Sequence, residues 1–422
     1  MLAQWIWGAR RSFIDVSFCG AVHVDSVHAD IVVVGGGIIG SCVAFYLAKS
    51  GADVVVLDPE PGQGSSAGNA GMLVPSQSVP FASPATVAAW VAALASRDST
   101  ISFRRPVPLS LVPWFARMAI EARPGRARRA TRNLFELAGK SLHLYQEMVD
   151  NEGIDLHLRP VGSLRVFRSV VALERQRRAL DELAGCGAEF EMLGPRKLRE
   201  IEPALRTGLA GAIKFPHDRS LDPARATRAI ADAARARGAQ FRAERVVGFQ
   251  RAGGRVVMVR TDRGCLSADE FVVAAGAASA QVGKLLGARL PVRAGYGLSV
   301  TYPTGSPLLR SSVMLEEEHV VINSRESWVR LTTGMEFGGT AHDRPGAGAV
   351  RRLDAVTRAY VPTLPAHDTA QPPWRGARPM TPSGTPCIGR IAANVIAATG
   401  HGTLGMTLGP VTGHLVSSLV AG

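Results

Sequence analysis

Two runs of apolar residues, separated by a helical pattern, stand near the beginning of the chain. Residues 31–34 are consecutive β-branched residues, which is typical of a parallel strand buried on both faces. Residues 41–51 then carry apolar side chains at helical spacing, and residues 53–58 are a second aliphatic run closed by an acid. This order predicts a β-α-β unit.

The rest of the chain mixes both periodicities. Helical spacing occurs in residues 132–153 and 173–187, whereas apolar and polar residues alternate in 162–169 and 327–337, which predicts strands with one buried face. Residues 241–264 hold two strand patterns around a Gly-Gly pair and predict a β-hairpin. The sequence therefore predicts an α/β protein that also contains an antiparallel sheet.

The end of the chain repeats the order of its beginning. Residues 394–398 predict a strand, a glycine-rich turn follows at 399–405, and the remaining apolar residues predict a closing helix. Because the first turn of a helix carries partial positive charge, we expect this turn to face a negative group.

Composition limits the class of protein. A chain of 422 residues exceeds one usual hydrophobic core, so two domains are expected. No run of about 20 apolar residues occurs, so no membrane-spanning helix is predicted. The five cysteines are scattered without a C-x-x-C pair, which argues against a zinc or iron–sulfur site and leads us to expect no metal. Their odd number favours a reducing, cytoplasmic location.

Residues 1–28 resemble a secretory signal only weakly. Asp15 and Ser17 interrupt the apolar stretch, and no A-x-A cleavage site follows. We therefore expect either a disordered N-terminal extension or a start codon placed too far upstream.

The formal net charge of +13 comes mainly from arginines, which are densest at 123–132, beside a second group at 103–108. Three interpretations compete: a solvated helix face, a nucleic-acid surface, and a contact for anionic lipid head groups. Nucleic-acid binding is not expected, because aromatic residues make up 6% of the chain and do not interleave with the arginines. The solvated face is favoured, and peripheral contact with the inner membrane face remains the second interpretation.

The turn after the first strand reads GGGIIG, which is G-x-G-x-x-G at Gly35, Gly37 and Gly40. The first glycine of this motif permits a tight turn, the second lets backbone approach a pyrophosphate, and the third lets the helix pack close to the strand. Asp58 ends the second strand, where an acid can accept hydrogen bonds from ribose hydroxyls. The motif predicts a dinucleotide site without separating FAD from NAD.

The loop at 59–73 favours the flavin. It is rich in small and polar residues, among them Ser66, Asn69 and Gly71. NAD enzymes usually continue into another strand–helix unit at this point, whereas this loop can hydrogen-bond a flavin ring and its phosphates.

Segments along nearly the whole chain resemble the FAD-dependent D-amino-acid oxidase superfamily, most closely its bacterial D-amino-acid dehydrogenase small-subunit branch. They occur in the family's order and are GGGIIG, SSAGNAGML, DRSLDPARATRAI, FVVAAGAAS, LPVRAGYGLSVTYP, VRLTTGMEFGG, GARPMTPSGTPCIG and TGHGTLGMTLGPVTGHL. Two departures occur: Ser383 stands where the family usually has Asp, and the GYGLS element differs from the family's form around Tyr296.

The resemblance implies a Rossmann-like FAD-binding domain interleaved with an α+β substrate domain that contains an antiparallel sheet. The FAD-binding domain would comprise 29–80, 218–286 and 376–422, and the substrate domain 81–217 and 287–375. The residues implied to bind FAD are Gly35, Gly37, Ile38, Ile39, Gly40, Asp58, Ser66, Asn69, Ala70, Gly71, Val246, Gly276, Gly402, Thr403, Leu404 and Gly405.

The implied reaction is oxidative deamination of a D-amino acid by hydride transfer to flavin N5, with electrons passed to a quinone or a carrier protein. Such chemistry needs a neutral amine and an anchored carboxylate, and an arginine fork suits the carboxylate. Arg378 is the first candidate, with a loop arginine paired to an acid as the alternative, and Arg330 is a weaker one. Tyr296 could cap the substrate or merely pack, and His401 could contact substrate or flavin or merely cap its turn.

Three rival functions remain at this stage. The nearest keeps the fold but takes a secondary amino acid, such as D-hydroxyproline, D-proline or sarcosine. A nucleotide-binding protein with a structural flavin and a nicotinamide-dependent reductase are the others.

Overall fold

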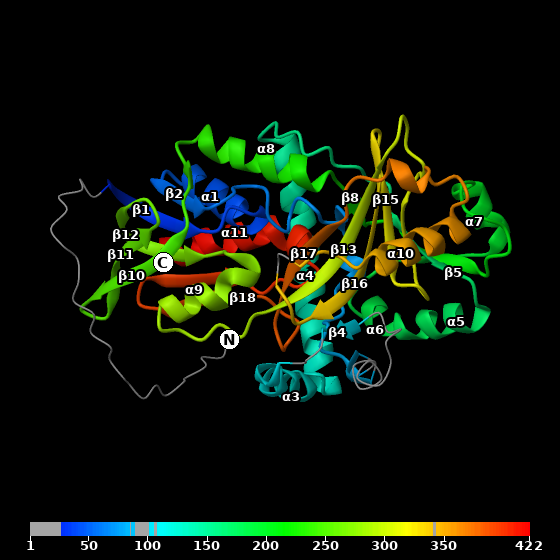
Figure 1. Ribbon diagram of the computed structural model, residues 1–422, viewed down its shortest axis with the longest axis horizontal. Helices are drawn as coiled ribbons and strands as arrows, with labels where there is room; N and C mark the ends of the chain where they lie inside the picture. The colour runs from blue at the N-terminus through cyan, green and yellow to red at the C-terminus, as the bar shows by residue number, and fades with distance from the viewer. Residues whose placement is uncertain (1–26, 85, 89–100, 105–107, 341–342) are drawn as a thin grey trace.

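Two β-sheets lie side by side along the long axis of the molecule (Figure 1). The computed structural model describes residues 27–422 except 85, 89–100, 105–107 and 341–342. The expected N-terminal extension at 1–28 lies outside the described residues, apart from Val27 and His28. These two residues belong to the first strand, because they continue its parallel pairing with Leu266 and Ser267.

The first sheet is the nucleotide-binding sheet that the β-α-β pattern predicts. Within the described chain it has eight strands, in the order β10-β11-β12-β1-β2-β9, with β19 beside β12 and β18 beyond it. Strands β19, β12, β1, β2 and β9 are parallel, and β10, β11 and β18 are antiparallel additions. Their bounds are β1 Val27–Val34, β2 Val54–Asp58, β9 Gln240–Ala243, β10 Val246–Ala252, β11 Arg255–Thr261, β12 Cys265–Val273, β18 Cys387–Ala392 and β19 Val395–Thr399.

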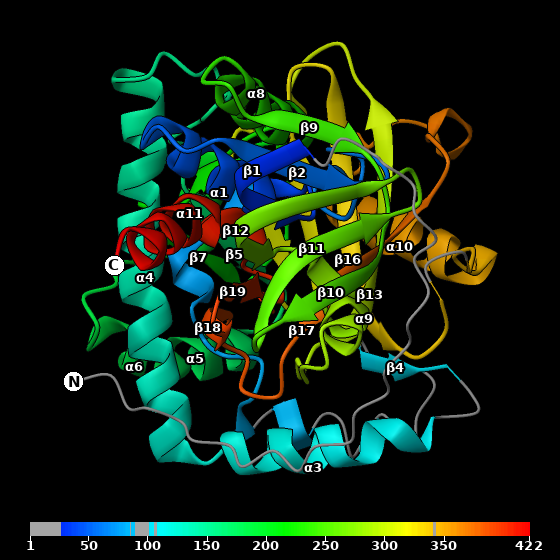
Figure 2. The ribbon, with the colours of Figure 1, turned by 90° about the vertical axis from the view of Figure 1, so that its left-hand side faces the viewer.

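Helices cover both faces of this sheet, as continuous aliphatic strands require. Ile31 and Val33 point toward one face, where α1, α8 and α11 pack, whereas Val32 and Val34 point toward the other, where α9 packs. Figure 2 shows α1 and α11 stacked behind the strands. The bounds are α1 Ile38–Lys49, α8 Pro223–Arg235, α9 Ser279–Leu285 and α11 Gly405–Ala421.

The second sheet is mostly antiparallel and forms the other half of the molecule. Its order is β17-β13-β16-β15-β14-β5-β7-β6, and β4 pairs with β16. The pairs β14–β5 and β16–β4 are parallel. The bounds are β4 Ile101–Phe103, β5 Ser163–Phe167, β6 Glu191–Leu193, β7 Gly211–Phe215, β13 Arg293–Pro303, β14 Ser312–Leu315, β15 Val320–Ser324, β16 Trp328–Phe337 and β17 Trp374–Met380.

The two sheets confirm the predicted fold class, a Rossmann-like FAD-binding unit joined to an α+β unit. The exact domain boundaries stay a prediction, and β17 crosses the expected boundary at residue 376. The remaining elements are the short pair β3 Met72–Leu73 and β8 Arg219–Ser220, the 3₁₀ turns η1 Pro75–Gln77, η2 Leu109–Leu111, η3 Gly276–Ala278 and η4 His367–Thr369, and the helices α3 Val112–Glu121, α4 Pro124–Asp150, α5 Val170–Ala179, α6 Asp181–Ala184, α7 Pro195–Ile201 and α10 Ala347–Tyr360.

Several predicted boundaries were wrong for identifiable reasons. The helix predicted at 132–153 begins at Pro124, because the arginine-rich segment continues the helix behind a proline in its first turn. The helix predicted at 173–187 is divided into α5 and α6. The hairpin predicted at 241–264 covers only β10 and β11, because residues 240–243 pair with β2 instead. No helix of the described chain is long and apolar enough to cross a membrane.

Candidate active site

The four central parallel strands bring distant segments to one edge of the first sheet. Strands β1, β2, β12 and β19 end at Val34, Asp58, Val273 and Thr399, and parallel strands end on the same side. Ligands of open α/β sheets bind at this carboxyl edge. The glycine motif, the loop after β2 and the turn before α11 therefore meet in space.

The glycines after β1 are required by close backbone contacts. A Cβ atom on Gly35 would lie 2.5 Å from the carbonyl oxygen of Ala274, and Gly35 has a φ of +111°. A Cβ on Gly40 would lie 1.8 Å from the carbonyl oxygen of Gly35. Helix α1 can approach the strand this closely only because both positions lack a side chain.

The N-terminus of α1 is arranged to receive an anion. The helix starts after Gly37, which gives no side-chain cap, and has no acid in its first turn, so the amides of this turn are available to an anion. Ser66 Oγ accepts a hydrogen bond from the Ile38 amide at 3.0 Å, which places the loop beside this helix end. The Asp58 carboxylate accepts the Gly36 amide at 2.7 Å, so the acid is anchored next to the glycine turn.

The loop at 64–71 is held by two polar side chains of the second sheet. Arg330 Nη1 on β16 donates to the carbonyls of Ala67 and Asn69 at 2.9 and 2.8 Å. Asn323 Nδ2 on β15 donates to the carbonyl of Ala70 at 2.7 Å. Gly71, at a φ of +78°, ends the loop where a Cβ would lie 2.3 Å from the Leu221 carbonyl oxygen. The second sheet therefore fixes the backbone of the predicted flavin loop.

The turn before α11 supplies the opposite side of the site. Gly402 has a φ of +57° and donates its amide to the Pro379 carbonyl at 2.9 Å. Thr403, Leu404 and Gly405 follow, and α11 begins with no side-chain cap. The Gly276 carbonyl accepts a hydrogen bond from Thr399 Oγ1 at 3.1 Å, which joins the end of β12 to this turn.

His401 is fully buried in the same turn. Its Nε2 lies 2.9 Å from Thr412 Oγ1, whereas its Nδ1 has no hydrogen-bond partner within the described chain. Burial lowers the pKa of this imidazole to about 3, so the ring is neutral at physiological pH. An orphaned buried nitrogen is expected where a polar ligand completes a site.

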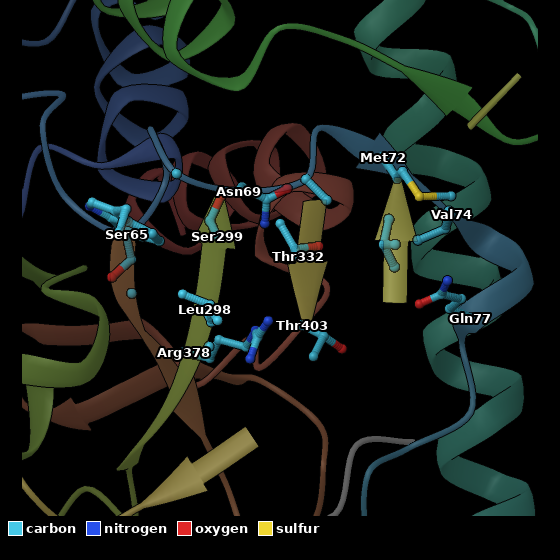
Figure 3. A pocket seen from close by; sticks show the side chains of 16 residues that line it. Ser65, Asn69, Met72, Val74, Gln77, Leu298, Ser299, Thr332, Arg378 and Thr403 are labelled. Atoms are coloured by element: carbon cyan, nitrogen blue, oxygen red, sulfur yellow. The ribbon is translucent and has the colours of Figure 1, made fainter. Parts of the chain in front are cut away.

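A cavity opens between the loop, the turn and the second sheet (Figure 3). Small, polar and apolar residues from both halves of the molecule line it: Ser65, Gly68, Asn69, Ala70, Met72, Val74, Gln77, Gly297, Leu298, Ser299, Val321, Thr332, Trp374, Gly376, Arg378 and Thr403. Among the described residues, none that lines the cavity is an acid, histidine, lysine, cysteine or tyrosine. Arg378 is the one charged side chain among the described residues that line this cavity.

The Arg378 guanidinium packs directly against the backbone of Gly297. A Cβ on Gly297 of β13 would lie 2.4 Å from the Arg378 guanidinium nitrogens, so this position must be glycine. Arg378 Nη1 donates to the Gly334 carbonyl at 2.7 Å, and within the described chain it makes no salt bridge. The protein surrounds the guanidinium so closely that burial lowers its pKa to about 10. It remains a cation at neutral pH without a protein counter-charge.

Tyr296 does not line the cavity. Neighbouring residues of a strand point to opposite faces, and the Tyr296 ring packs beneath the Arg375 guanidinium, 3.6 Å from the ring centroid. Arg375 in turn pairs with Glu336. The structure thus separates Tyr296 from Arg378, and the catalytic role of this tyrosine stays a prediction.

Val246 also lies outside the cavity, at the start of β10. It follows Ala243, whose partner in the parallel pairing is Asp58. Its implied contact with the adenine end stays a prediction.

The sequence matches the FAD dependent oxidoreductase family over residues 30–419. This chain belongs to that family. It is 32% identical to a D-amino acid dehydrogenase of Rhizorhabdus wittichii over 403 residues, which cover 93% of this chain and 96% of the relative. Glycine oxidase from Geobacillus kaustophilus has a similar structure, with a TM-score of 0.71 and 26% identity, covering 94% of this chain and 95% of that one. L-proline dehydrogenase from P. horikoshii has a TM-score of 0.71 at 21% identity and 94% coverage of both chains, which shows the fold alone.

The family resemblance and the FAD cofactor are therefore confirmed, and the chain is an FAD-dependent oxidoreductase. Its residues fit the cofactor, because the glycine turn and the N-terminus of α1 suit a pyrophosphate. The role of each individual residue stays a prediction.

Sequence reasoning missed several residues of this site. Arg330 was considered only as a substrate anchor, and Asn323, Thr332 and Gln77 were not singled out. The strand alternation at 327–337 places Arg330 and Thr332 on one face, but nothing local shows that this face meets the flavin loop.

Proposed function

We propose that this FAD-dependent oxidoreductase oxidises the bond between Cα and nitrogen of a D-amino acid, whose imine is then hydrolysed by water. One observation carries the proposal: the half-buried cation of Arg378 faces the cavity, and within the described chain it has no carboxylate partner. A buried charge is costly unless it is paired, so a substrate carboxylate completes the site. The relative named D-amino acid dehydrogenase supports the substrate class and its configuration.

The residues of the chain act by binding and orientation. The planar fork of Arg378 binds the substrate carboxylate and thereby restricts rotation of the substrate about its Cα. Arg330 and Asn323 donate hydrogen bonds to the backbone of the loop at 64–71. They thereby fix this loop as the opposite wall of the cavity. When bound, FAD supplies the hydride acceptor of the reaction.

None of the described residues that line the cavity carries a carboxylate, imidazole, amine or thiol. We therefore propose that the amine reaches the site in its neutral form and that no side chain of the lining removes a proton from Cα. This favours transfer of the Cα hydrogen as a hydride over carbanion chemistry.

A secondary amino acid such as D-proline, D-hydroxyproline or sarcosine is the second candidate. The same arginine would anchor its carboxylate.

Anaerobic titration of the purified holoenzyme tests the proposal. The visible flavin absorbance is followed as separate D- and L-amino acids, sarcosine and cis-4-hydroxy-D-proline are added. Bleaching by D-amino acids but not by their mirror images is expected. Selective bleaching by the secondary amines would favour the second candidate, and a bound flavin indifferent to the whole panel would exclude amine oxidation.

We further propose that the protein lies in the cytoplasm and contacts the inner face of the membrane, where the electrons pass to a quinone or a carrier protein. The arginines at the start of α4, among them Arg128 and Arg129, are exposed, and Leu109, Val112 and Ile120 beside them are 85%, 59% and 45% exposed. Figure 2 shows α3 along one edge of the molecule, next to the first turns of α4. We call the residues 109–132 of η2, α3 and α4 the α3 surface. Exposed apolar side chains beside arginines suit a surface of anionic lipids.

A further inference from the structure

Gln77 occupies the side of the cavity that faces Arg378. Figure 3 shows the Gln77 amide on one side and the Arg378 guanidinium on the other, with Thr332 and Thr403 between them. A substrate whose carboxylate binds Arg378 would therefore extend its side chain toward Gln77.

Gln77 lies beside apolar walls of the cavity, which Met72 and Val74 form. Within the described chain, the Gln77 amide nitrogen donates to Met314 Sδ at 3.6 Å, and a thioether is a weak acceptor. The amide thus keeps donor and acceptor capacity for a neutral polar group of a ligand.

A buried polar network holds the backbone next to Gln77. Ser76 donates its hydroxyl to Asp218 Oδ2 at 2.7 Å and its amide to Asp218 Oδ1 at 3.3 Å. Ser163 donates to the same carboxylate at 2.5 Å, and Arg165 Nη2 donates to the Ser76 carbonyl at 3.0 Å. All four residues are at most 8% exposed. Burying charged and hydroxyl side chains costs free energy. Their burial beside η1 therefore indicates that the backbone position of η1 is important for the site.

From this arrangement we infer that Gln77 is a specificity residue that hydrogen-bonds a neutral polar group, such as a hydroxyl, on the substrate side chain, and that Ser76 and Asp218 are its positioning residues. The inference rests on the proposed function, since it assumes that Arg378 binds the substrate carboxylate. It adds to that function the class of substrate side chain that the enzyme accepts, which is one with a neutral polar group.

Pairs of substrates that differ by a hydroxyl test the inference. D-Threonine is compared with D-valine, and cis-4-hydroxy-D-proline with D-proline, by the rate of anaerobic flavin reduction. The ratio of kcat/KM for the hydroxylated member over its partner is expected to fall about 10-fold in Gln77→Leu, because the hydroxyl loses its partner. The rates with D-valine and D-proline should change little.

Two further variants separate positioning from general damage. Ser76→Ala removes a donor to Asp218 and should lower the same ratio by about 5-fold, which corresponds to the loss of one net hydrogen bond of about 1 kcal/mol. Val79→Ala is the matched control, because Val79 follows η1, is 49% exposed and does not line the cavity. It should leave the ratio unchanged.

The outcomes distinguish the two proposals. If Gln77→Leu slows both members of each pair equally while flavin stays bound, the specificity role is wrong and amine oxidation stands. If no amino acid reduces the flavin of the wild-type enzyme, the proposed function itself fails.

Discussion

At the scale of single residues, Arg378 and Gly297 form one functional unit. The guanidinium needs the space that a missing side chain leaves, since a Cβ at 297 would lie 2.4 Å from it. The guanidinium also needs an anion, since its charge is buried without a protein counter-charge. Two residues far apart in the sequence thereby shape the proposed carboxylate site.

Replacing Arg378 by Met should abolish carboxylate binding while leaving the apolar stem. We expect kcat/KM to fall by about 100-fold or more, mainly through KM, because a buried charge-assisted pair is lost. Arg378→Lys should recover little, because an ammonium cannot make the planar fork. Steady-state kinetics and the flavin spectrum provide the readout, with exposed Arg263→Met as the control. Loss of bound FAD in Arg378→Met alone would point to a cofactor role instead.

Adding one methyl group at Gly297 should displace the same arginine. Gly297→Ala is expected to raise KM at least several-fold with unchanged FAD content, because the new Cβ overlaps the guanidinium. Gly305→Ala is the matched control, since a Cβ there meets nothing within 4 Å. Equal kinetics of the two variants would contradict the placement of Arg378.

The buried neutral His401 makes stability depend on pH. Its pKa is about 3 in the folded chain and about 6.5 in the unfolded chain. The unfolded state therefore binds an extra proton between these values, and stability falls as pH drops below about 6.5. Between pH 7 and pH 5 this amounts to roughly 2 kcal/mol.

Urea denaturation at both pH values, for wild type and His401→Gln, measures this contribution. Acidification should lower the free energy of unfolding of the variant by about 2 kcal/mol less than that of the wild type. All other titrating groups are common to both proteins, so their contributions cancel. An identical pH dependence in both proteins would show that His401 is not buried in its neutral form.

At the scale of elements, the close approach of α1 to β1 determines whether the pyrophosphate site can form. A Cβ on Gly40 would lie 1.8 Å from the Gly35 carbonyl oxygen, so any side chain there pushes the helix away from the strand. The helix would then no longer present its uncapped amides to the turn.

Gly40→Ala should destabilise the protein by about 1–3 kcal/mol and lower FAD occupancy, as expected for overpacking at a backbone contact. Gly139→Ala, also within a helix but with open space around it, should stabilise α4 by up to about 1 kcal/mol. Thermal denaturation and the flavin-to-protein absorbance ratio test both. A stable, fully loaded Gly40→Ala protein would refute the close-contact argument.

At the scale of the whole molecule, the site exists only where the two sheets meet. The first sheet contributes the glycine turn and the turn before α11, and the second contributes Arg330, Asn323 and Arg378. The α3 surface lies on a different part of the molecule and carries no residue of the cavity.

Vesicle binding tests the proposed membrane contact of that surface. The full chain should sediment with phosphatidylglycerol vesicles and not with phosphatidylcholine vesicles. Arg128→Glu with Arg129→Glu should weaken binding at least about 10-fold, because each arginine contributes about 1 kcal/mol. Arg175→Glu with Arg178→Glu, exposed on α5, is the control of equal charge. Equal weakening by both pairs, or no binding at all, would leave the arginines as a solvated helix face.

The sequence by itself determined the β-α-β unit, the dinucleotide turn and the family. These features depend on residues that are neighbours in the chain, so periodicity and glycine spacing are sufficient to reveal them. The boundaries of α4 and of the hairpin were less certain, because pairing with other elements decides where such segments end.

Only the tertiary structure decided which polar residues share the cavity. Arg378 and Tyr296 belong to adjacent strands, but the register of β13 turns one toward the cavity and the other toward Arg375. A shift of one residue in that register would exchange the two faces. Gln77 likewise owes its place to the hydrogen bond between its neighbour Ser76 and Asp218, which are 142 positions apart in the sequence. Contacts between distant segments depend on how strands pair and layers pack, and no local pattern of residues contains that information.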